Sequence, residues 1–344
     1  MGRPEKAKLR ELTGSPHVLF PVGEAGGRFR SVQEACETGV KADFPLYHCD
    51  SCNTETVYFI CEQCGNQTRK TYYCKGCDIK LNIDYCPTHG TAVDFMAKRL
   101  DIKHYLDSAI KKLNMQKTEV PVLIKGVRGT SSESHIPEHL SKGVLRAMFG
   151  LNVNKDGTIR YDAVEVPITH FKPKEIHADI SKLKEVGYTH DIYGKELENE
   201  EQVLEIKPHD VILPCAPDSL DEQADEVFIR VCKFIDNLLV RLYGLRPFYN
   251  VNSGEDLIGK LTVGIAPHNC AGVVCRIIGF SNTQSFLASP YIHAAMRRDC
   301  DGDEASLSML MDVLLNFSRG FLPAHRGGTQ DAPLVLNARI RPGE

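Results

Sequence analysis

The sequence of 344 residues contains no tryptophan, so neither the core nor any interface can be built around that side chain. No apolar run approaches the roughly 18 residues that a membrane-spanning helix needs, and no segment has the pattern of a secretory signal. The net charge is −4 rather than positive, which would argue against phosphate binding if charge were evenly spread. Basic residues are clustered, however, and only local clusters contact phosphate. We therefore expect an intracellular globular protein whose ligands are decided by local motifs.

Cysteine, in contrast, is abundant, and seven of the 13 cysteines lie in residues 49–86. The candidate ligands form four pairs, here called knuckles, and in each pair two residues lie between the two ligands. The knuckles are Cys49 and Cys52, Cys61 and Cys64, Cys74 and Cys77, and Cys86 and His89. A tetrahedral zinc site requires such close pairs joined by short hairpins. The pattern predicts two closed structural zinc sites, the second of them Cys₃His, rather than disulfides. The spacing leaves open which knuckles pair, since an interleaved arrangement would also satisfy it.

Acidic residues are concentrated in the aspartate loop, residues 297–304, where two arginines precede three aspartates and one glycine. Magnesium prefers hard oxygen ligands, and carboxylates that project from a sharp turn are what a phosphoryl-transfer site supplies. Gly302 allows the backbone to turn so that the carboxylates beside it can face one point. The predicted magnesium ligands are Asp301 and Asp303, with Asp299 as a third candidate. The alternative is a solvated acidic turn, which is the commoner meaning of an isolated Asp-x-Asp pattern.

The segments around this loop favour the metal-binding interpretation. Apolar residues follow it at the spacing of a buried helical face, which would give the carboxylates a rigid support: Leu307, Leu310, Met311, Leu314 and Leu315. Arg297 and Arg298 precede it and are candidates for binding phosphate. Residues 261–280 read as a strand, a glycine-rich turn and a strand, which is typical of a small β-barrel. Residues 222–243 are expected to form a long helix, and residues 3–8 the start of a basic helix.

Together these motifs resemble a known family, the large catalytic subunit of the archaeal family D DNA polymerase, also called DNA polymerase II. The segments that carry the resemblance lie in the same order along the chain: residues 1–8, 155–162, 169–173, 264–280, 297–304 and 326–335. The resemblance covers nearly all of the sequence. It implies a mixed α+β fold with a β-barrel core, in which two double-psi β-barrels, shared with multisubunit RNA polymerases, carry a zinc-ribbon insertion. It also implies a part of a longer subunit, whether from a split gene, a gene fragment or an expressed piece.

Combined with the zinc pattern, the resemblance divides the chain into four regions. Residues 1–43 would be part of the first double-psi barrel, and residues 44–93 the zinc region with its two pairs of knuckles. Residues 94–130 would be a helical connector. Residues 131–344 would form the second barrel, with helical insertions and the aspartate loop.

The function implied by the resemblance is template-directed DNA synthesis by a replicative polymerase that uses two magnesium ions. Its substrates would be a DNA primer-template and dNTPs. Its partners would be the remaining segments of the large subunit and a small subunit that carries the 3′–5′ exonuclease. The sliding clamp would be reached through the missing C-terminal region. The expected location is the cytoplasm, at the nucleoid, without membrane contact.

The resemblance also assigns roles to particular residues. Lysines of the first barrel face the catalytic aspartates in this family, and Lys6 and Lys8 are the candidates for that role. Asp299 departs from the asparagine expected at its position. An additional carboxylate would either tighten metal binding or place unwanted charge beside the triphosphate. The candidates elsewhere for contacting DNA or phosphate are Arg326, His170 and Lys172.

Two other interpretations stay open. One is a noncatalytic, zinc-containing fragment of a split polymerase that binds DNA or another subunit. A missing partner gene nearby would favour it. Closed four-ligand zinc sites do not separate it from the polymerase, since they leave no position for a substrate and stabilise a segment with too little core to fold alone. The other is a relative of RNA polymerase, because the barrels are shared, and a preference for ribonucleotides would reveal it.

Overall fold

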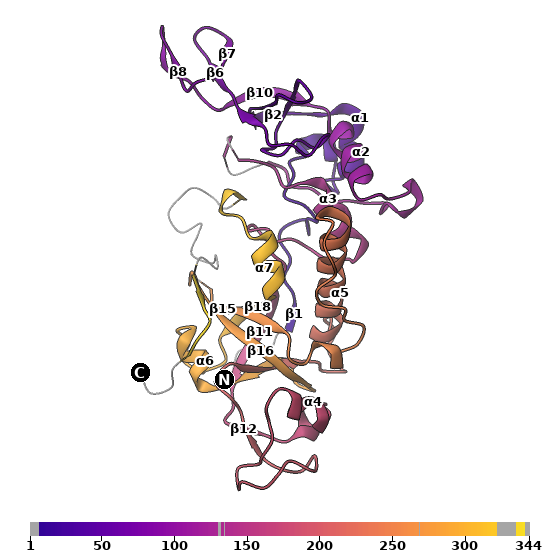
Figure 1. The fold of residues 1–344 in the computed structure, drawn as a ribbon, viewed down its shortest axis with the longest axis vertical. Helices are drawn as coiled ribbons and strands as arrows, with labels where there is room; N and C mark the ends of the chain where they lie inside the picture. Colours follow the sequence, from indigo (N-terminus) through magenta and orange to yellow (C-terminus); the bar gives the residue numbers. More distant parts are fainter. Residues whose placement is uncertain (1–6, 130–131, 134, 268, 322–334, 341–344) are drawn as a thin grey trace.

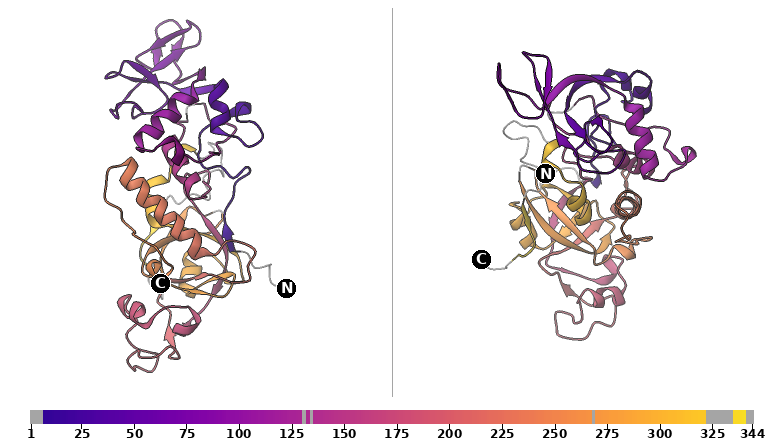
Figure 2. Two further views of the ribbon diagram at one scale, coloured as in Figure 1. Left: turned by 90° about the vertical axis from the view of Figure 1, so that its right-hand side faces the viewer. Right: turned by 45° about the horizontal axis from the view of Figure 1, so that its top comes forward.

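The fold comes from a computed structural model that describes residues 7–129, 132–133, 135–267, 269–321 and 335–340. The molecule is elongated (Figures 1 and 2), with the zinc region at one end and a small two-stranded sheet, β12–β13, at the other. A large β-sheet lies between them. Within the described residues, no helix combines the length and the apolar character needed to cross a membrane.

Among the described residues, the large sheet has eight strands, in the order β1, β11, β17, β14, β16, β15 and β18, with β19 beside β16. Their bounds are β1 Ala7–Leu9, β11 Tyr161–Pro167, β14 Asp210–Pro214, β15 Leu261–Ile265, β16 Ala271–Ser281, β17 Ser285–Ala288, β18 Glu304–Met309 and β19 Val335–Asn337. Three strand pairs are parallel and the others antiparallel, and β11 also pairs with β18. The expected mixture of helices and strands is therefore confirmed, in the form of one large mixed sheet.

Strand β16 illustrates how the sequence builds this sheet. It carries valines and isoleucines, whose branched side chains favour the pleated conformation, and most of its residues are buried. The predicted strand, turn and strand over residues 261–280 correspond to β15 and β16, and the prediction is confirmed.

Helix α5 (Ala224–Asn237) packs against β1, β14 and β18 and continues into a π-helical turn, η4 (Leu238–Leu242). The residues of its buried face recur at helical spacing: Val227, Phe228, Val231, Phe234 and Ile235. The helix predicted over residues 222–243 is confirmed. Helix α6 (Pro290–Ala295) packs against β11, and helix α7 (Leu310–Asn316) packs against β15 and β18.

Two segments expected to be helical are strands. The apolar positions after the aspartate loop begin as β18, and the helix starts only at Leu310. Strand β18 pairs with β11 on one edge and β15 on the other, so ladder hydrogen bonds on both edges outweigh the helical spacing of its side chains. Residues 7 and 8, the described part of the expected basic helix start, belong to β1 because this strand pairs with β11.

The connector over residues 94–130 is helical only in part. Strand β10 (Phe95–Leu100) pairs along its whole length with β2 (Val40–Pro45). Helix α2 (Ile102–Lys112) follows, and the side chain of Asp101 caps its first turn. The prediction was wrong for β10, since pairing with a distant strand cannot be inferred from local periodicity.

Short elements make up the rest of the molecule. In the zinc region the strands are β3 Tyr47–Cys49, β4 Thr54–Thr56, β5 Arg69–Lys70, β6 Tyr72–Cys74, β7 Ile79–Leu81, β8 Tyr85–Cys86 and β9 Gly90–Thr91. The remaining elements are η1 Gly23–Gly26, α1 Val32–Thr38, η2 Lys117–Glu119, α3 Leu140–Met148, β12 His170–Phe171, η3 Pro173–Glu175, α4 Ile180–Glu185, β13 Leu204–Glu205, η5 Glu255–Leu257 and η6 Arg319–Phe321. The strands β12 and β13 and helix α4 share a second apolar cluster with residues of β14 and β16.

A fully buried arginine joins segments from several parts of the chain. Arg146 of α3 donates to the two carboxylate oxygens of Glu138 at 2.9 and 2.7 Å. It also donates to the carbonyl oxygens of His17 and Gly157 at 3.0 and 2.9 Å. Its guanidinium lies 5.3 Å from the ring centre of Phe234. The arginine therefore connects helix α3 to segments before and after it and to α5.

Candidate functional site

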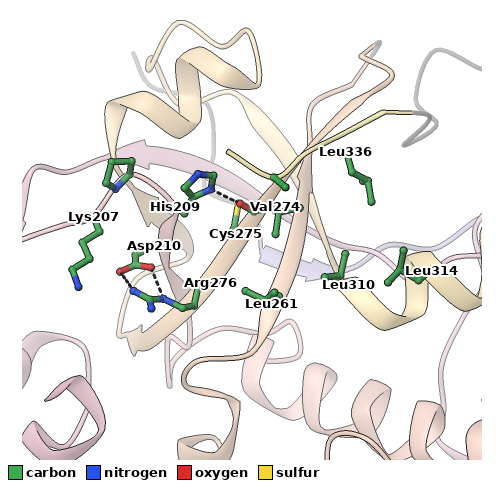
Figure 3. A pocket seen from close by; sticks show the side chains of 12 residues that line it. Lys207, His209, Asp210, Leu261, Val274, Cys275, Arg276, Leu310, Leu314 and Leu336 are labelled. Atoms are coloured by element: carbon green, nitrogen blue, oxygen red, sulfur yellow. Dashed lines mark hydrogen bonds and ion pairs between the residues drawn. The ribbon is translucent and has the colours of Figure 1, made fainter. Parts of the chain in front are cut away.

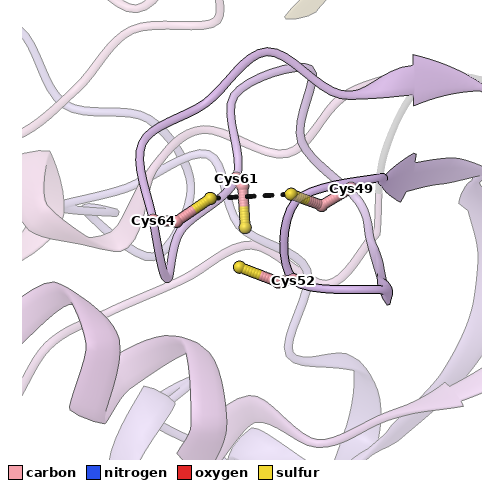
Figure 4. Close-up of side chains that lie close together, drawn as sticks. All are labelled: Cys49, Cys52, Cys61 and Cys64. Atoms are coloured by element: carbon pink, nitrogen blue, oxygen red, sulfur yellow. Dashed lines mark hydrogen bonds between the residues drawn. The ribbon is translucent and has the colours of Figure 1, made fainter.

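The first cysteine cluster has neighbouring knuckles paired, which excludes the interleaved arrangement. The Sγ atoms of its members all lie within 4.8 Å of one another: Cys49, Cys52, Cys61 and Cys64. Figure 4 shows the four side chains converging from two loops. The Sγ atoms of Cys49 and Cys64 are 3.5 Å apart, close to the roughly 3.8 Å expected for sulfurs bound tetrahedrally to zinc at about 2.3 Å. His48 lies outside the cluster and contacts Asp50 instead.

The second cluster also has the predicted members: Cys74, Cys77, Cys86 and His89. The Nδ1 atom of His89 lies 3.1 Å from Cys77 Sγ and 3.7 Å from Cys74 Sγ. Gly76, inside the knuckle, leaves room for this ring, because a Cβ atom there would lie 2.7 Å from it. A soft donor set with this spacing could hold zinc in both clusters.

Hydrogen bonds from backbone amide groups lower the thiol pKa of two of these cysteines. Hydrogen bonds from the Asn66 backbone lower the pKa of the Cys64 thiol to about 7. Those from Thr88 and His89 lower the pKa of the Cys86 thiol to about 6. Zinc binds the thiolate, so these turns stabilise the ligating form.

The aspartate loop connects α6 to β18 and has a strained backbone. The φ angles of Arg297, Cys300 and Gly302 are 61°, 62° and 89°. The left-handed conformation costs a residue other than glycine on the order of 1 kcal/mol or more, and such strain is concentrated at functional sites. The glycine was expected to turn the chain, whereas nothing in the sequence indicated the other two positions.

Arg298 contacts a predicted metal ligand within the same loop. Its Nη1 lies 3.1 Å from Asp303 Oδ2, and its Nη2 donates to the Glu304 carbonyl oxygen at 3.1 Å. The side chains of Arg298 and Asp303 are 18% and 17% exposed, so water only partly screens their attraction. Arg298 therefore braces the loop, and its contact with phosphate stays a prediction. Arg297 is exposed beside it.

The three predicted magnesium ligands do not form one tight cluster. In the part of the chain that the structure describes, the groups of three or more close ligand atoms are the two cysteine clusters. Asp299 and Asp301 are exposed, while Asp303 is half-buried. Magnesium keeps several waters and takes only one or two carboxylates from a protein. The donor set therefore suits magnesium, although its binding at Asp301 and Asp303 stays a prediction.

Sequence reasoning missed two buried polar residues that lie against this loop, Glu165 of β11 and His293 of α6. Their side chains are fully buried. The backbone places both residues at the loop, since the Glu165 amide donates to the Asp303 carbonyl oxygen and the Arg298 amide donates to the His293 carbonyl oxygen, each at 2.9 Å. A glutamate within a strand of otherwise mostly apolar residues was the signal available in the sequence.

Lys8 shares the large sheet with the aspartate loop. It lies opposite Asp162 of β11, and Asp162 lies opposite Ser306 of β18. Two strand spacings, about 10 Å, therefore separate β1 from β18. Asp162 accepts hydrogen bonds from Ser306 and from Arg10, each at 2.7 Å. Within the described chain, Lys8 makes no ion pair with the aspartates, and its catalytic role stays a prediction.

The other basic candidates lie elsewhere. Lys6 and Arg326 fall outside the residues that the structure describes. His170 and Lys172 lie at β12, at the end of the molecule opposite the zinc region. His170 is exposed, and Lys172 Nζ lies 3.2 Å from a carboxylate oxygen of Glu201. Their contact with DNA stays a prediction.

A pocket of about 630 Å³ opens beside β16 and α7 (Figure 3). Its polar side chains already have partners. Arg276 donates to both carboxylate oxygens of Asp210 at 2.8 Å. His209 donates from Nδ1 to the Val274 carbonyl and accepts the Ile340 amide at Nε2. The pocket is therefore an apolar groove without a free catalytic group among its described residues.

Residues 116–344 match the family model described as DNA polymerase II large subunit DP2, catalytic domain. The chain belongs to the DNA polymerase II large-subunit family. Residues 1–83 match the model of the central domain of the same subunit. The resemblance inferred from the sequence is confirmed, and the catalytic-domain match begins within the predicted connector.

Curated members of the DNA polymerase II large-subunit family align along essentially the whole chain. It is 48% identical to the DNA polymerase II large subunit of Nanoarchaeum equitans over 98% of its length. It is 46% identical to that of Archaeoglobus fulgidus and 42% identical to that of Pyrococcus furiosus, both over 100% of its length. The chain spans 30%, 30% and 27% of these three relatives.

Proposed function

We propose that this chain forms part of the catalytic core of a replicative DNA-directed DNA polymerase. The observation that carries the proposal is the match of residues 116–344 to the catalytic domain of the large subunit. That segment includes the strained aspartate loop at the head of β18. The relatives are more than three times as long as this chain, so the proposed activity is that of the complete large subunit.

The proposed fold is a double-psi β-barrel core with a zinc-ribbon insertion. A circuit of strand pairs supports it, since β11, β17, β14, β16, β15 and β18 pair in turn and β18 pairs again with β11. In the proposed division, residues 1–43 contribute to the first barrel and residues 131–344 form the second. The zinc region and the connector, residues 94–130, join them.

The residues of the aspartate loop have distinct proposed tasks. Asp301 and Asp303 hold the divalent cations, with Asp299 as a third carboxylate. Magnesium bound there, as two ions, would lower the pKa of the primer 3′-hydroxyl and neutralise charge on the triphosphate. Arg298 keeps Asp303 in place through their 3.1 Å contact. Arg297 is exposed at the start of the loop and can contact the phosphates of the incoming dNTP.

The proposed partners follow from the family. They are a DNA primer-template, the remaining segments of the large subunit, a small subunit carrying the 3′–5′ exonuclease, and the sliding clamp. Lys6, Lys8, Arg326, His170 and Lys172 are the proposed contacts to catalytic carboxylates, phosphate or DNA. The two zinc ions are structural, because four protein ligands leave no position for a substrate.

Primer extension tests the polymerase site. The complete large subunit with its small subunit would be assayed with dNTPs and Mg²⁺, with and without Asp301→Asn plus Asp303→Asn. Metal stabilisation of the transition state is worth several kcal/mol, and each 1.4 kcal/mol is a factor of ten. We therefore expect the double variant to lose at least about 100-fold in rate. Asp218→Asn plus Asp221→Asn, which removes two exposed charges from another loop, should keep the parental rate.

Equal extension by the parent and the double aspartate variant would refute the metal assignment and favour the noncatalytic zinc-fragment interpretation. Extension with ribonucleotides in preference to dNTPs would favour the RNA polymerase relative.

A further inference from the structure

Glu165 and His293 form a buried contact between β11 and α6. Both side chains are 0% exposed, and His293 Nδ1 lies 3.0 Å from Glu165 Oε2. The two groups are close enough for an ion pair but are not aligned for a hydrogen bond. In the described part of the chain, neither the carboxylate nor the imidazole has a hydrogen-bond partner.

Burying such a pair lowers the stability of the folded state. Taking a carboxylate and an imidazole out of water costs several kcal/mol unless further hydrogen bonds satisfy them. Apolar side chains of similar size would commonly give equal or greater stability at such a position. The contact therefore calls for a role other than stability.

The backbone atoms of the same two residues hold both ends of the aspartate loop. The Glu165 amide donates to the Asp303 carbonyl oxygen at 2.9 Å. The Arg298 amide donates to the His293 carbonyl oxygen at 2.9 Å. Residues 298 and 303 enclose the turn that carries Asp301. The side-chain contact thus joins the two points to which this turn is attached.

The position of the imidazole is fixed from the other side. Its ring stacks on Phe286 of β17, with ring centres 6.1 Å apart and planes inclined by 27°. Strand β17 in turn pairs with β11, placing Phe286 opposite Glu165. Rotation of His293 away from the carboxylate would therefore disturb the packing against β17.

We infer that Glu165 and His293 are a positioning pair, which sets the distance between β11 and α6 and so holds Asp301 and Asp303 for divalent cations. The role rests on the proposed function, because it concerns the same loop. Neither residue contacts the substrate. Both act through the backbone of the loop.

Mn²⁺ binding measured by electron paramagnetic resonance tests this role on the complete large subunit with its small subunit. The sites lost in Asp301→Asn plus Asp303→Asn define the loop site. Loss of an outer partner typically weakens a metal site about 10- to 100-fold, and we expect about a ten-fold loss in Glu165→Gln and in His293→Gln. The double variant should lose about ten-fold as well, because the residues act as one unit.

Two further measurements separate positioning from stability. In Glu165→Gln, primer extension at low Mg²⁺ should fall and recover when Mg²⁺ is raised, whereas a merely unfolded protein would not recover. Asp156→Asn is the control, because it breaks a similarly buried ion pair elsewhere. The side chain of Asp156 is 1% exposed and that of its partner Arg160 is 4% exposed. This variant should lower the melting temperature while leaving Mn²⁺ affinity at the loop unchanged.

The outcomes are distinguishable. If the two aspartate changes remove no Mn²⁺ site, both the proposed function and the positioning role fail. If they remove a site but Glu165→Gln and His293→Gln bind Mn²⁺ as the parent does, only the positioning role fails. Losses that multiply to about 100-fold in the double variant would show two independent residues and would also overturn the pair.

Discussion

Asp312 offers a prediction in which the pH dependence of stability is calculated from one side chain. It lies in α7, fully buried, and burial raises its pKa from the ordinary 3.8 to about 6. Its Oδ2 accepts the Ile159 amide at 2.6 Å, and its Oδ1 accepts the Asn316 amide group at 2.7 Å. The perturbation is Asp312→Asn. The amide can still accept from Ile159, and it can donate to Asn316 Oδ1, which has no partner among the described residues.

The sign follows from the raised pKa. A carboxyl group that ionises less readily in the folded state contributes stability below its unfolded pKa of about 3.8, and this contribution is lost as pH rises through about 6. The difference of about two units corresponds to about 3 kcal/mol at neutral pH. Asp312→Asn removes the ionisation. The variant should therefore be more stable than the parent by up to about 3 kcal/mol near pH 8, with no gain near pH 4.

Urea unfolding of parent and variant between about pH 4 and pH 8 measures this difference. Titration of every other carboxylate, and any effect of acid on the zinc sites, cancels because the two proteins share them. Asp221→Asn, at an exposed position, should show no pH-dependent difference from the parent. A gain for Asp312→Asn that stays constant with pH, or a loss that is largest near pH 8, would refute the assignment of a destabilising charge to Asp312.

Three further predictions concern metal and packing. Gly76→Ala would place a methyl group 2.7 Å from the His89 ring, and chelator competition should show about 10- to 100-fold weaker metal binding; Lys75→Ala in the same knuckle should bind as the parent does. Glu138→Gln leaves the charge of the fully buried Arg146 uncompensated, so the free energy of unfolding should fall by roughly 3–5 kcal/mol; an unchanged melting temperature would mean that backbone carbonyls suffice. Chelating both metals should open the zinc region to protease while the large sheet stays protected, and equal cleavage of both would contradict a local structural role.

The two cysteine clusters could be predicted because their chemistry is local. Each knuckle places two donors within one turn, and short hairpins join neighbouring knuckles, so spacing alone identified all eight members of the two clusters. The pairing needed the structure, which brings Cys49 and Cys64 to 3.5 Å. Helix α5 was predictable for a similar reason, since its buried face repeats at the helical period over four turns.

Elements whose conformation depends on a distant partner could not be predicted. The apolar residues of β18 fit a helical face, yet they pair with β11 and β15 on both edges. Strand β10 is decided in the same way by β2. In both segments the local pattern suited a helix, and hydrogen bonds to a strand far away in sequence determined the outcome.

The aspartate loop combines both situations. Its carboxylates and Gly302 are recognisable in the sequence, because a metal site needs hard donors on a turn. In the positioning role inferred above, their placement depends on Glu165 and His293, which lie far apart in sequence and meet where α6 packs on β11. The kind of donor group in the loop can thus be read from one segment of the sequence. The position of those groups depends on how the strands and helices around the loop pack. We therefore expect Glu165→Gln, a change far from Asp301 in sequence, to weaken divalent-cation binding at the loop without removing a proposed ligand.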